Sequence, residues 1–405
     1  MTGPSLVTHR PTYPTVALAK DVGRAIRQGH PWVYRSALVT AKTEAFTDGL
    51  LVAVAGRNGA PLGWGFWTAD GPIAIRMMST RIDTTRGKRP NDVVNKLIGK
   101  RLTQAMNRRL AALDVQRTNA FRWVHGEADG LPGIHLDRYD RICVVRFDGS
   151  GARAFYSPLL PKLERSLAEL TPTLAIEKLI DREQPGEASE PFVVRECGLQ
   201  FEIAAGGGQK GGLFLDQRDN RTLVAEHARG KSVLNLFGYT GGFSVHAAAA
   251  GARRTDTVDI AAPAIASARR NFEHNGLPVD QHGFWAIDAF EFLENAAHKG
   301  QTWDIVICDP PSFAPRQSAL GAAAKAYTKL HRMSAEVVAP GGLLCAASCS
   351  SHIRRDHFLQ LVQDGVTAAK RRHTVLDNRG SGIDHPVIPA FPEGDYLKFV
   401  MSRLD

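Results

Sequence analysis

The sequence predicts an α/β protein in which a small β-barrel and an α+β region precede a C-terminal, doubly wound sheet of mostly parallel strands. Three observations lead to this class. With 405 residues, 43% of them hydrophobic, the chain is too long for one ordinary core. Short β-type runs separated by glycine and asparagine turns occupy residues up to about 80. From Leu199 onward, strand and helix patterns alternate.

The N-terminal half divides into a barrel, a linker and an α+β region. We expect Trp64, Phe66 and Trp67 to form the core of the barrel rather than a base-stacking surface. The basic stretch 86–90 predicts a linker, and a helix over about 92–112 follows it. The predicted domains are residues 15–82, 92–196 and 198–405.

A glycine turn opens the C-terminal region. The apolar run that ends at Phe237 is followed by Gly238, Thr240 and Gly241, and then by an alanine-rich helix. Glycines in such a turn let a ligand approach the backbone closely. A second strand ends at Asp259, where a carboxylate conventionally accepts hydrogen bonds from ribose hydroxyls. This layout fits the adenosine of S-adenosylmethionine. It also suits NAD, but the G-x-G-x-x-G spacing is missing.

Two further segments border this predicted cofactor site. Asp288 follows a third strand, so it either meets the adenine amino group or caps the next helix, and the sequence leaves both interpretations open. The glycine-rich stretch 206–218 predicts a loop that folds over a ligand and leads into a helix near Asp219. Gln209 and Arg218 in this stretch are further candidates for cofactor binding, as is Asp309 farther along the chain.

The most informative pattern is a carboxylate and a thiol that each follow a predicted strand. Asp309-Pro310-Pro311 ends the apolar run 303–308, and Ser348-Cys349-Ser350 ends the run after Gly341. Open α/β sheets bind ligands at this edge. The prolines keep the loop extended, so that the Asp309 carboxylate can meet a planar base edge. A nucleobase methyltransferase needs this geometry.

Cytosine chemistry explains why the thiol would matter. Carbon 5 of cytosine is too poor a nucleophile to take a methyl group from a sulfonium, so a thiolate must first add to carbon 6. Cys349 is the candidate nucleophile. Asp309, beside the ring nitrogen, would hold or supply the proton that stabilises the adduct. Taken alone, Cys349 could be inert packing and Asp309-Pro310-Pro311 an ordinary turn; their combination after a nucleotide-type turn favours the functional interpretation.

The motifs resemble those of the bacterial large-subunit ribosomal RNA cytosine-5 methyltransferases of the RlmI type. The segments that carry the resemblance, in the expected order, are Gly208-Gln209-Lys210, Leu215-Asp216-Gln217-Arg218, Asn235-Leu236-Phe237, Tyr239-Thr240-Gly241, Asp309-Pro310-Pro311, Ser348-Cys349-Ser350 and the run from Phe391 to Lys398. Upstream, His125-Gly126-Glu127 resembles the entry to the family's central domain, and His30-Pro31-Trp32 resembles the start of its RNA-binding PUA barrel.

The resemblance implies a Rossmann-like, seven-stranded class I methyltransferase sheet, S-adenosylmethionine as the cofactor and large-subunit ribosomal RNA as the substrate. By position it makes Cys349 the nucleophile, Asp309 the carboxylate that contacts the base and Asp259 the ribose ligand. The chain departs from the wider class at Ser312, where a second cysteine often follows the proline pair. The group that assists product release is therefore unassigned.

Two other functions stay open at this point. An exocyclic-amine methyltransferase would use Asp309-Pro310-Pro311 and the nearby Phe313 without needing Cys349. A non-catalytic ribosome-assembly factor would keep the fold as an RNA-binding scaffold.

The charge distribution favours an RNA partner. Residues 1–125 contain 19 basic and 7 acidic side chains, whereas the remainder contains 31 and 34. A polyanion would therefore meet the N-terminal third first. Predicted RNA contacts are Arg24, Arg27, Arg35, Arg86, Lys88 and Arg89.

The cysteine and histidine content bears on metal binding and on the cellular compartment. Five cysteines without a C-x-x-C pair, and the lack of clustered histidines, argue against a disulfide framework and a zinc site. No signal peptide or membrane span is expected. We therefore expect a cytoplasmic protein with RNA and no membrane as its partner. A homodimer is conceivable.

Overall fold

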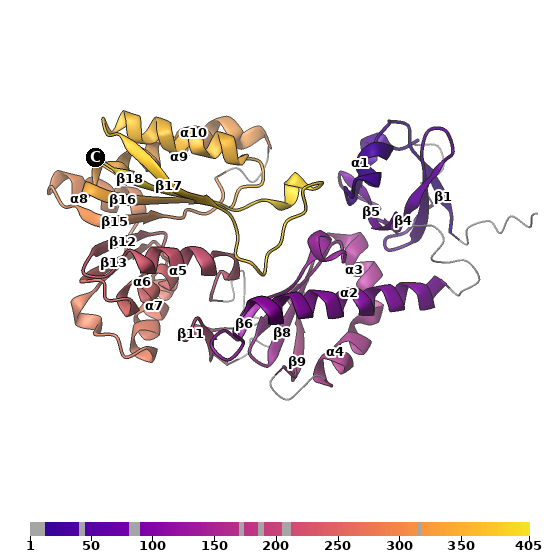
Figure 1. Cartoon of the computed structure of the whole chain (residues 1–405), viewed down its shortest axis with the longest axis horizontal. Helices are drawn as coiled ribbons and strands as arrows, with labels where there is room; N and C mark the ends of the chain where they lie inside the picture. Colours follow the sequence, from indigo (N-terminus) through magenta and orange to yellow (C-terminus); the bar gives the residue numbers. More distant parts are fainter. Residues whose placement is uncertain are drawn as a thin grey trace, which may run out of the picture. The chain divides into compact units, whose positions relative to one another are not determined.

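The computed structural model describes residues 13–39, 45–80, 90–169, 174–184, 190–204, 212–313 and 317–405 (Figure 1). The chain divides into two compact units. Unit 1 comprises residues 1–112, 122–185 and 386–392, and unit 2 comprises residues 113–121, 186–385 and 393–405.

Unit 1 begins with a five-stranded sheet in the order β1-β3-β4-β5-β2. The elements are β1 (Thr15–Ala17), α1 (Gly23–Arg27), β2 (Trp32–Tyr34), β3 (Leu51–Ala55), β4 (Pro61–Trp67) and β5 (Ile73–Ser79). Trp64, Phe66 and Trp67 are all buried, as the sequence predicted. Gly65 is required in β4 because a Cβ there would lie 2.1 Å from the Arg76 carbonyl oxygen, next to a register shift between β4 and β5.

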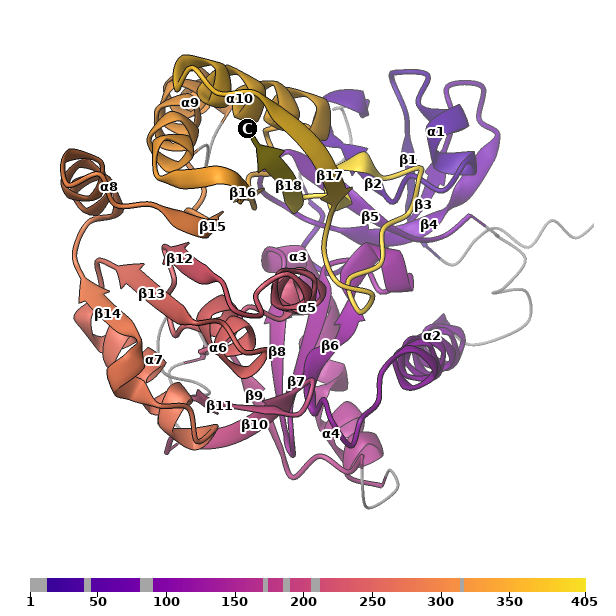
Figure 2. The ribbon, with the colours of Figure 1, turned by 60° about the vertical axis from the view of Figure 1, so that its left-hand side comes forward.

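The second part of unit 1 is a four-stranded sheet in the order β6-β7-β8-β9, with helices beside it (Figure 2). Its elements are α2 (Pro90–Ala112), β6 (Ala120–His125), β7 (Ile134–Tyr139), β8 (Ile142–Phe147), α3 (Ser150–Tyr156), α4 (Leu160–Ala168) and β9 (Lys178–Asp181). Phe66 of the barrel stacks on Phe155 with the ring centroids 4.5 Å apart. Glu127 accepts hydrogen bonds from Arg76 and from the Trp32 indole, the latter at 2.7 Å. Buried aromatic and charged contacts therefore join the barrel to the α+β part.

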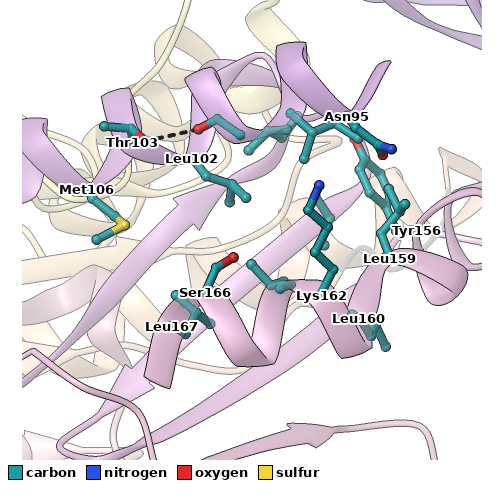
Figure 3. Close-up of a pocket in the computed structure, with 15 residues that line it drawn as sticks. Asn95, Leu102, Thr103, Met106, Tyr156, Leu159, Leu160, Lys162, Ser166 and Leu167 are labelled. Atoms are coloured by element: carbon teal, nitrogen blue, oxygen red, sulfur yellow. Dashed lines mark hydrogen bonds between the residues drawn. The ribbon is translucent and has the colours of Figure 1, made fainter. Parts of the chain in front are cut away.

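A cavity of about 240 Å³ lies in unit 1 between α2 and α4 (Figure 3). Leu102, Met106 and Leu163 contribute to its mostly apolar walls, and Asn95 and Lys162 are among its polar lining residues. None of the predicted site residues lines this cavity. It is therefore separate from the chemistry that the sequence predicts.

Unit 2 is built on a seven-stranded sheet in the order β14-β13-β12-β15-β16-β18-β17. Its strands are β12 (Ser232–Leu236), β13 (Arg254–Asp259), β14 (Gly283–Ala286), β15 (Trp303–Cys308), β16 (Val338–Ser348), β17 (His373–Arg379) and β18 (Lys398–Leu404). The strands β12 to β16 pair in parallel, and β18 is antiparallel to both β16 and β17. The predicted mostly parallel, doubly wound sheet is confirmed.

Helices cover both faces of this sheet (Figure 1). The helices are α5 (Arg218–Glu226), α6 (Gly242–Ala249), α7 (Ala262–His274), α8 (Ala289–His298), α9 (Leu320–Glu336) and α10 (Arg355–Ala368). Leu234 and Val306 belong to a core with α8, α9 and α10, whereas Val233 and Ile305 pack with α5 and α6. Because side chains alternate along a strand, both faces of the central strands are mostly apolar; the buried Asn235 of β12 is a polar exception that donates to Ser244 Oγ. A hairpin of β10 (Phe192–Glu196) and β11 (Leu199–Ile203) completes the unit.

In the described part of the chain, no helix combines the length and the apolar character that crossing a bilayer requires. The same residues contain no group of three or more His, Cys, Asp or Glu side chains able to hold a metal ion.

The core of unit 2 yields a stability prediction. Leu234→Ala, in the fully buried centre of β12, should lower the free energy of unfolding by about 2–5 kcal/mol, because it removes apolar burial and leaves a cavity. Leu376→Ala on the exposed surface of edge strand β17 is the matched control and should cost less than about 0.5 kcal/mol. Urea unfolding of the two variants measures the difference. Equal effects would contradict the assignment of β12 to the core.

Candidate active site

The candidate site lies where the order of the strands reverses. The central strand β12 pairs in parallel with β13 on one side and with β15 on the other, so that the chain leaves these strands at one edge. β16 lies next to β15, with Cys308 opposite Ala346. The crevice at such a switch point is the usual ligand site of an open α/β sheet. Asp309 and Cys349 follow the ends of β15 and β16, so neighbouring strands deliver the two groups.

The turn after β12 has a strained backbone. Phe237 and Tyr239 adopt positive φ angles of 55° and 48°, which non-glycine residues rarely do. Gly238 is needed between them, because a Cβ there would lie 2.7 Å from the Thr257 side chain. The Thr240 hydroxyl donates to the Gly212 carbonyl. Such conformations persist only where the surroundings hold them, and they concentrate at ligand sites.

Asp259 is oriented by the backbone around it. One carboxylate oxygen accepts a hydrogen bond from the Tyr239 N–H at 2.9 Å, and the other accepts one from the Ala261 N–H at 2.9 Å. A carboxylate offers about four acceptor positions, so these two bonds fix the group and leave it able to accept from hydroxyls. The Ile260 side chain, next in sequence, is 72% exposed. An apolar surface beside a fixed carboxylate suits a nucleoside.

The Asp288 side chain caps α8. Its Oδ1 accepts hydrogen bonds from the Phe290 N–H at 2.8 Å and the Glu291 N–H at 3.2 Å. This is the helix-cap interpretation that the sequence had left open beside the adenine contact. An adenine contact through the other oxygen stays a prediction.

Gln217 connects the Asp216-Gln217-Arg218 motif to Asp309. Its Nε2 donates to Asp309 Oδ2 at 2.9 Å, while its Oε1 accepts from Asn220 Nδ2 at 2.6 Å. The amide of Gln217 is therefore fixed on both sides. This bond sets the position of the carboxylate that the sequence assigned to the base.

Arg218 makes a buried ion pair. Its side chain is only 2% exposed, and its Nη2 lies 2.8 Å from Asp384 Oδ1. Its Nε donates to Asp219 Oδ1 at 3.1 Å. Burial tends to raise the pKa of Asp384, but the charges and hydrogen bonds of His385 and Arg218 outweigh it and hold that pKa far below its usual range. Arg218 thus anchors the loop between β17 and β18 to α5; its predicted contact with the cofactor stays untested.

Cys349 is the exposed member of the five cysteines. Cys143, Cys308 and Cys345 are buried, and Cys197 is intermediate. Although the Cys349 residue is exposed as a whole, desolvation of its thiol, followed by the charges of Asp309 and Asp216, raises its pKa to about 11. A thiol with this pKa is mostly protonated at neutral pH.

Sequence comparisons identify the family. A family model described as S-adenosylmethionine-dependent methyltransferase matches residues 174–381. The chain belongs to this family. A second model, described as a PUA-like domain, matches residues 16–80.

Two curated methyltransferases match almost end to end, and both are named Ribosomal RNA large subunit methyltransferase I. The protein from Photobacterium profundum is 33% identical over 394 residues, which cover 95% of this chain and 98% of the relative. The one from Shewanella denitrificans is 31% identical over 397 residues, which cover 94% and 97%. The family resemblance predicted from the motifs is confirmed.

Solved structures agree on the fold. "A putative sam-dependent methyltransferase from Streptococcus mutans" is 23% identical, with a TM-score of 0.80 over 96% of this chain and 100% of that chain. A chain described as "a putative methyltransferase complexed with SAH" is 24% identical, also with a TM-score of 0.80, over 96% and 99%.

The methyltransferase cofactor is S-adenosylmethionine, and the described residues fit it. Gly238 lets the turn pack closely against Thr257 and Asn235, Asp259 can accept hydroxyl hydrogen bonds, and Ile260 offers an apolar surface. We predict that Phe237, Gly238, Thr240, Gly241 and Asp259 contribute to the cofactor site. Gln209 lies outside the described residues.

The predicted RNA contacts of this methyltransferase fall into three groups. Arg24 and Arg27 on α1 are exposed. Arg35 donates to the Thr68 carbonyl at 2.6 Å and the Gly71 carbonyl at 2.9 Å, so much of its guanidinium holds the β4–β5 turn. Arg86, Lys88 and Arg89 lie outside the described residues.

Sequence reasoning missed two groups at the methyltransferase site. The role of Gln217 as the partner of Asp309 was missed, since the motif was assigned to a ligand-covering loop. Ile260 was missed as well, although an apolar residue directly after a strand-ending aspartate is a readable signal.

The Asp259 geometry predicts a loss of cofactor affinity. Asp259→Ala should weaken S-adenosylmethionine binding by about 1.5–3 kcal/mol, because charge-assisted hydrogen bonds to the ribose are removed. Asp280→Ala, which removes an exposed carboxylate from the same unit, is the control and should bind normally. Titration calorimetry measures both. Unchanged affinity in Asp259→Ala would rule out its role as the ribose ligand.

Proposed function

We propose that the protein transfers a methyl group from S-adenosylmethionine to carbon 5 of cytosine in large-subunit ribosomal RNA. The curated relatives that it matches end to end bear names that support this substrate. One observation carries the proposed chemistry: Cys349, an exposed residue, and Asp309 follow neighbouring strands at the switch point of the sheet. The reducing cytoplasm, where such RNA occurs, suits a free thiol.

The proposed reaction proceeds in three steps. The Cys349 thiolate adds to carbon 6, while a proton shared with Asp309 stabilises the electron density that moves into the ring. Carbon 5 then takes the methyl group that the sulfonium of the bound cofactor supplies. Water takes the proton from carbon 5, because no residue is assigned as the base for this step; the electron pair returns to the ring and the bond between carbon 6 and sulfur breaks. The thiolate is regenerated and 5-methylcytosine leaves.

Two neighbours would prepare Asp309 for this role. Gln217 donates to one of its oxygens and keeps the carboxylate in place. Pro310 and Pro311 restrict the backbone that follows. A carboxylate held in this way loses little entropy when a base binds, which is a general route to effective catalysis.

The exocyclic-amine alternative relies on an aromatic residue after the proline pair. Phe313 is half-buried, and its ring lies 4.8 Å from that of Tyr327 between the ring centroids. Part of its surface is thus used in packing against α9. The covalent reaction needs no free aromatic ring at this position, and we favour it for that reason.

We also propose that residues 15–82 bind RNA, residues 92–196 form the central domain and residues 198–405 bind the cofactor. The PUA-like match over residues 16–80 and the basic excess of the N-terminal third support the first assignment. Arg24 and Arg27 are the described candidates for phosphate contacts.

A mechanism-based trap tests the covalent step. Wild-type protein incubated with cofactor and RNA containing 5-fluorocytosine should form an adduct that survives denaturing electrophoresis, because fluorine cannot leave carbon 5 as a proton does. Cys349→Ala should form no adduct and no 5-methylcytosine, yet bind the cofactor normally. Cys197→Ala is the matched control and should behave as wild type. Methylation by Cys349→Ala would reject the covalent route and favour the exocyclic amine.

The RNA assignment predicts a change in salt dependence. Replacing Arg24 and Arg27 together by Gln should weaken RNA binding and flatten the plot of log affinity against log salt by about 0.7–0.9 for each lost phosphate contact. Cofactor affinity should stay unchanged. Replacement of the exposed Arg372 and Arg403 by Gln removes the same charge elsewhere and serves as the control. Identical slopes in both double variants would show that α1 makes no phosphate contacts.

A further inference from the structure

Lys398 is a buried cation beside the candidate nucleophile. It is the first residue of β18 and is only 1% exposed. Its Nζ donates to the carbonyl of Ser350, the residue after Cys349, and to the carbonyl of Tyr396 at 2.7 Å. Burial lowers the pKa of this ammonium to about 8. An ammonium in such a place is costly, so its presence calls for a physical reason.

The two carbonyls belong to the two segments that frame the thiol. Ser350 lies on the loop after β16, and its N–H donates to Ser348 Oγ at 3.3 Å. Tyr396 precedes β18, and its hydroxyl donates to Asp216 Oδ2 at 2.6 Å. One amino group therefore ties the cysteine loop to the segment that also holds the Asp216 carboxylate.

The charges around the thiol oppose one another. Asp309 and Asp216 raise the pKa of Cys349, and Lys398 acts in the opposite direction. Around Lys398, in turn, Cys349 and Asp395 favour the charged amine, and Arg355 disfavours it. A neutral donor could satisfy the two carbonyls at a lower cost of desolvation. Packing alone therefore does not explain why the positively charged side chain of Lys398 occupies this position.

We propose that Lys398 is a positioning residue for methyl transfer, which fixes the loop of Cys349 and supplies the positive charge that favours a thiolate there. This inference rests on the proposed role of Cys349 as the nucleophile. The ammonium keeps its proton throughout, so it acts through its charge and its two hydrogen bonds. The positive charge of Lys398 thus offsets Asp309, the carboxylate proposed to contact the base, and Asp216, which both oppose ionisation of the thiol.

The pH dependence of thiol alkylation tests this role without requiring turnover. Iodoacetamide reacts with the thiolate, and the full-length protein presents Cys349 as its exposed cysteine; Cys349→Ala supplies the background rate. Lys398→Met should shift the midpoint of Cys349 alkylation upward by about one pH unit, which lowers the rate roughly tenfold at a pH below both midpoints. The difference should be largest below about pH 8, where the lysine is charged. Lys398→Arg should retain much of the wild-type midpoint.

Removal of a carboxylate, instead of the ammonium, provides the matched control. Asp216→Asn removes a carboxylate that disfavours the thiolate, so its midpoint should shift downward. In methylation assays, Lys398→Met should lower kcat with little change in the KM for the cofactor. If Lys398→Met unfolds, Lys398→Gln provides a second neutral variant that can still donate to a carbonyl; its midpoint should also rise, and an unchanged midpoint would overturn the role of Lys398.

Different results would contradict the role of Lys398 and the role of Cys349 as the nucleophile. An unchanged alkylation midpoint in folded Lys398→Met would overturn the role of Lys398, whatever the reaction is. Methylation by Cys349→Ala would instead overturn the nucleophile. The alkylation profile would then still measure the charge effect at a thiol without a catalytic role.

Discussion

The parallel pairing of β12 with both β13 and β15 is the constraint on which the candidate site depends. Because three parallel strands end at one edge, the turn after β12, Asp259 at the end of β13 and Asp309 after β15 emerge together. The antiparallel strand β18 then pairs with β16 and places Lys398 opposite Ser348. Without this strand order, the carboxylate, the thiol and the ammonium would have no common location.

Adjacent residues of one sequence motif make different kinds of contact. Gln217 and Arg218 are adjacent, yet one holds Asp309 and the other holds the buried Asp384. In unit 1, Asp129 likewise accepts from Arg109 and from the backbone of His125. Such buried ion pairs add little net stability against well-packed apolar residues, but they require one geometry. Their contribution here is the placement of loops.

Charged groups around the Cys349 thiol have opposing effects on its ionisation. A carboxylate near the base assists proton handling, but the same charge keeps Cys349 protonated. The raised pKa makes the free thiol a poor nucleophile and therefore protects it from unwanted alkylation or oxidation. The buried Lys398 works in the opposite direction. A balance of this kind allows the site to respond to small changes in its surroundings.

Much of this protein follows from the sequence alone. Apolar runs bounded by glycines predicted strands such as β12 and β15, and the motifs predicted the family, the cofactor and the pair of Asp309 and Cys349. The sequence left Asp288 between two interpretations and missed Gln217 as the partner of Asp309. Lys398 was noted only as the end of a motif. The helix cap of Asp288 is a local contact, whereas the contacts of Gln217 and Lys398 were decided only by the tertiary structure, because they depend on which distant segments meet. Gln217 and Asp309 are 92 positions apart, and Lys398 and Ser350 are 48 apart. Local patterns determine the elements, whereas long-range strand pairing and burial determine which side chains share a site.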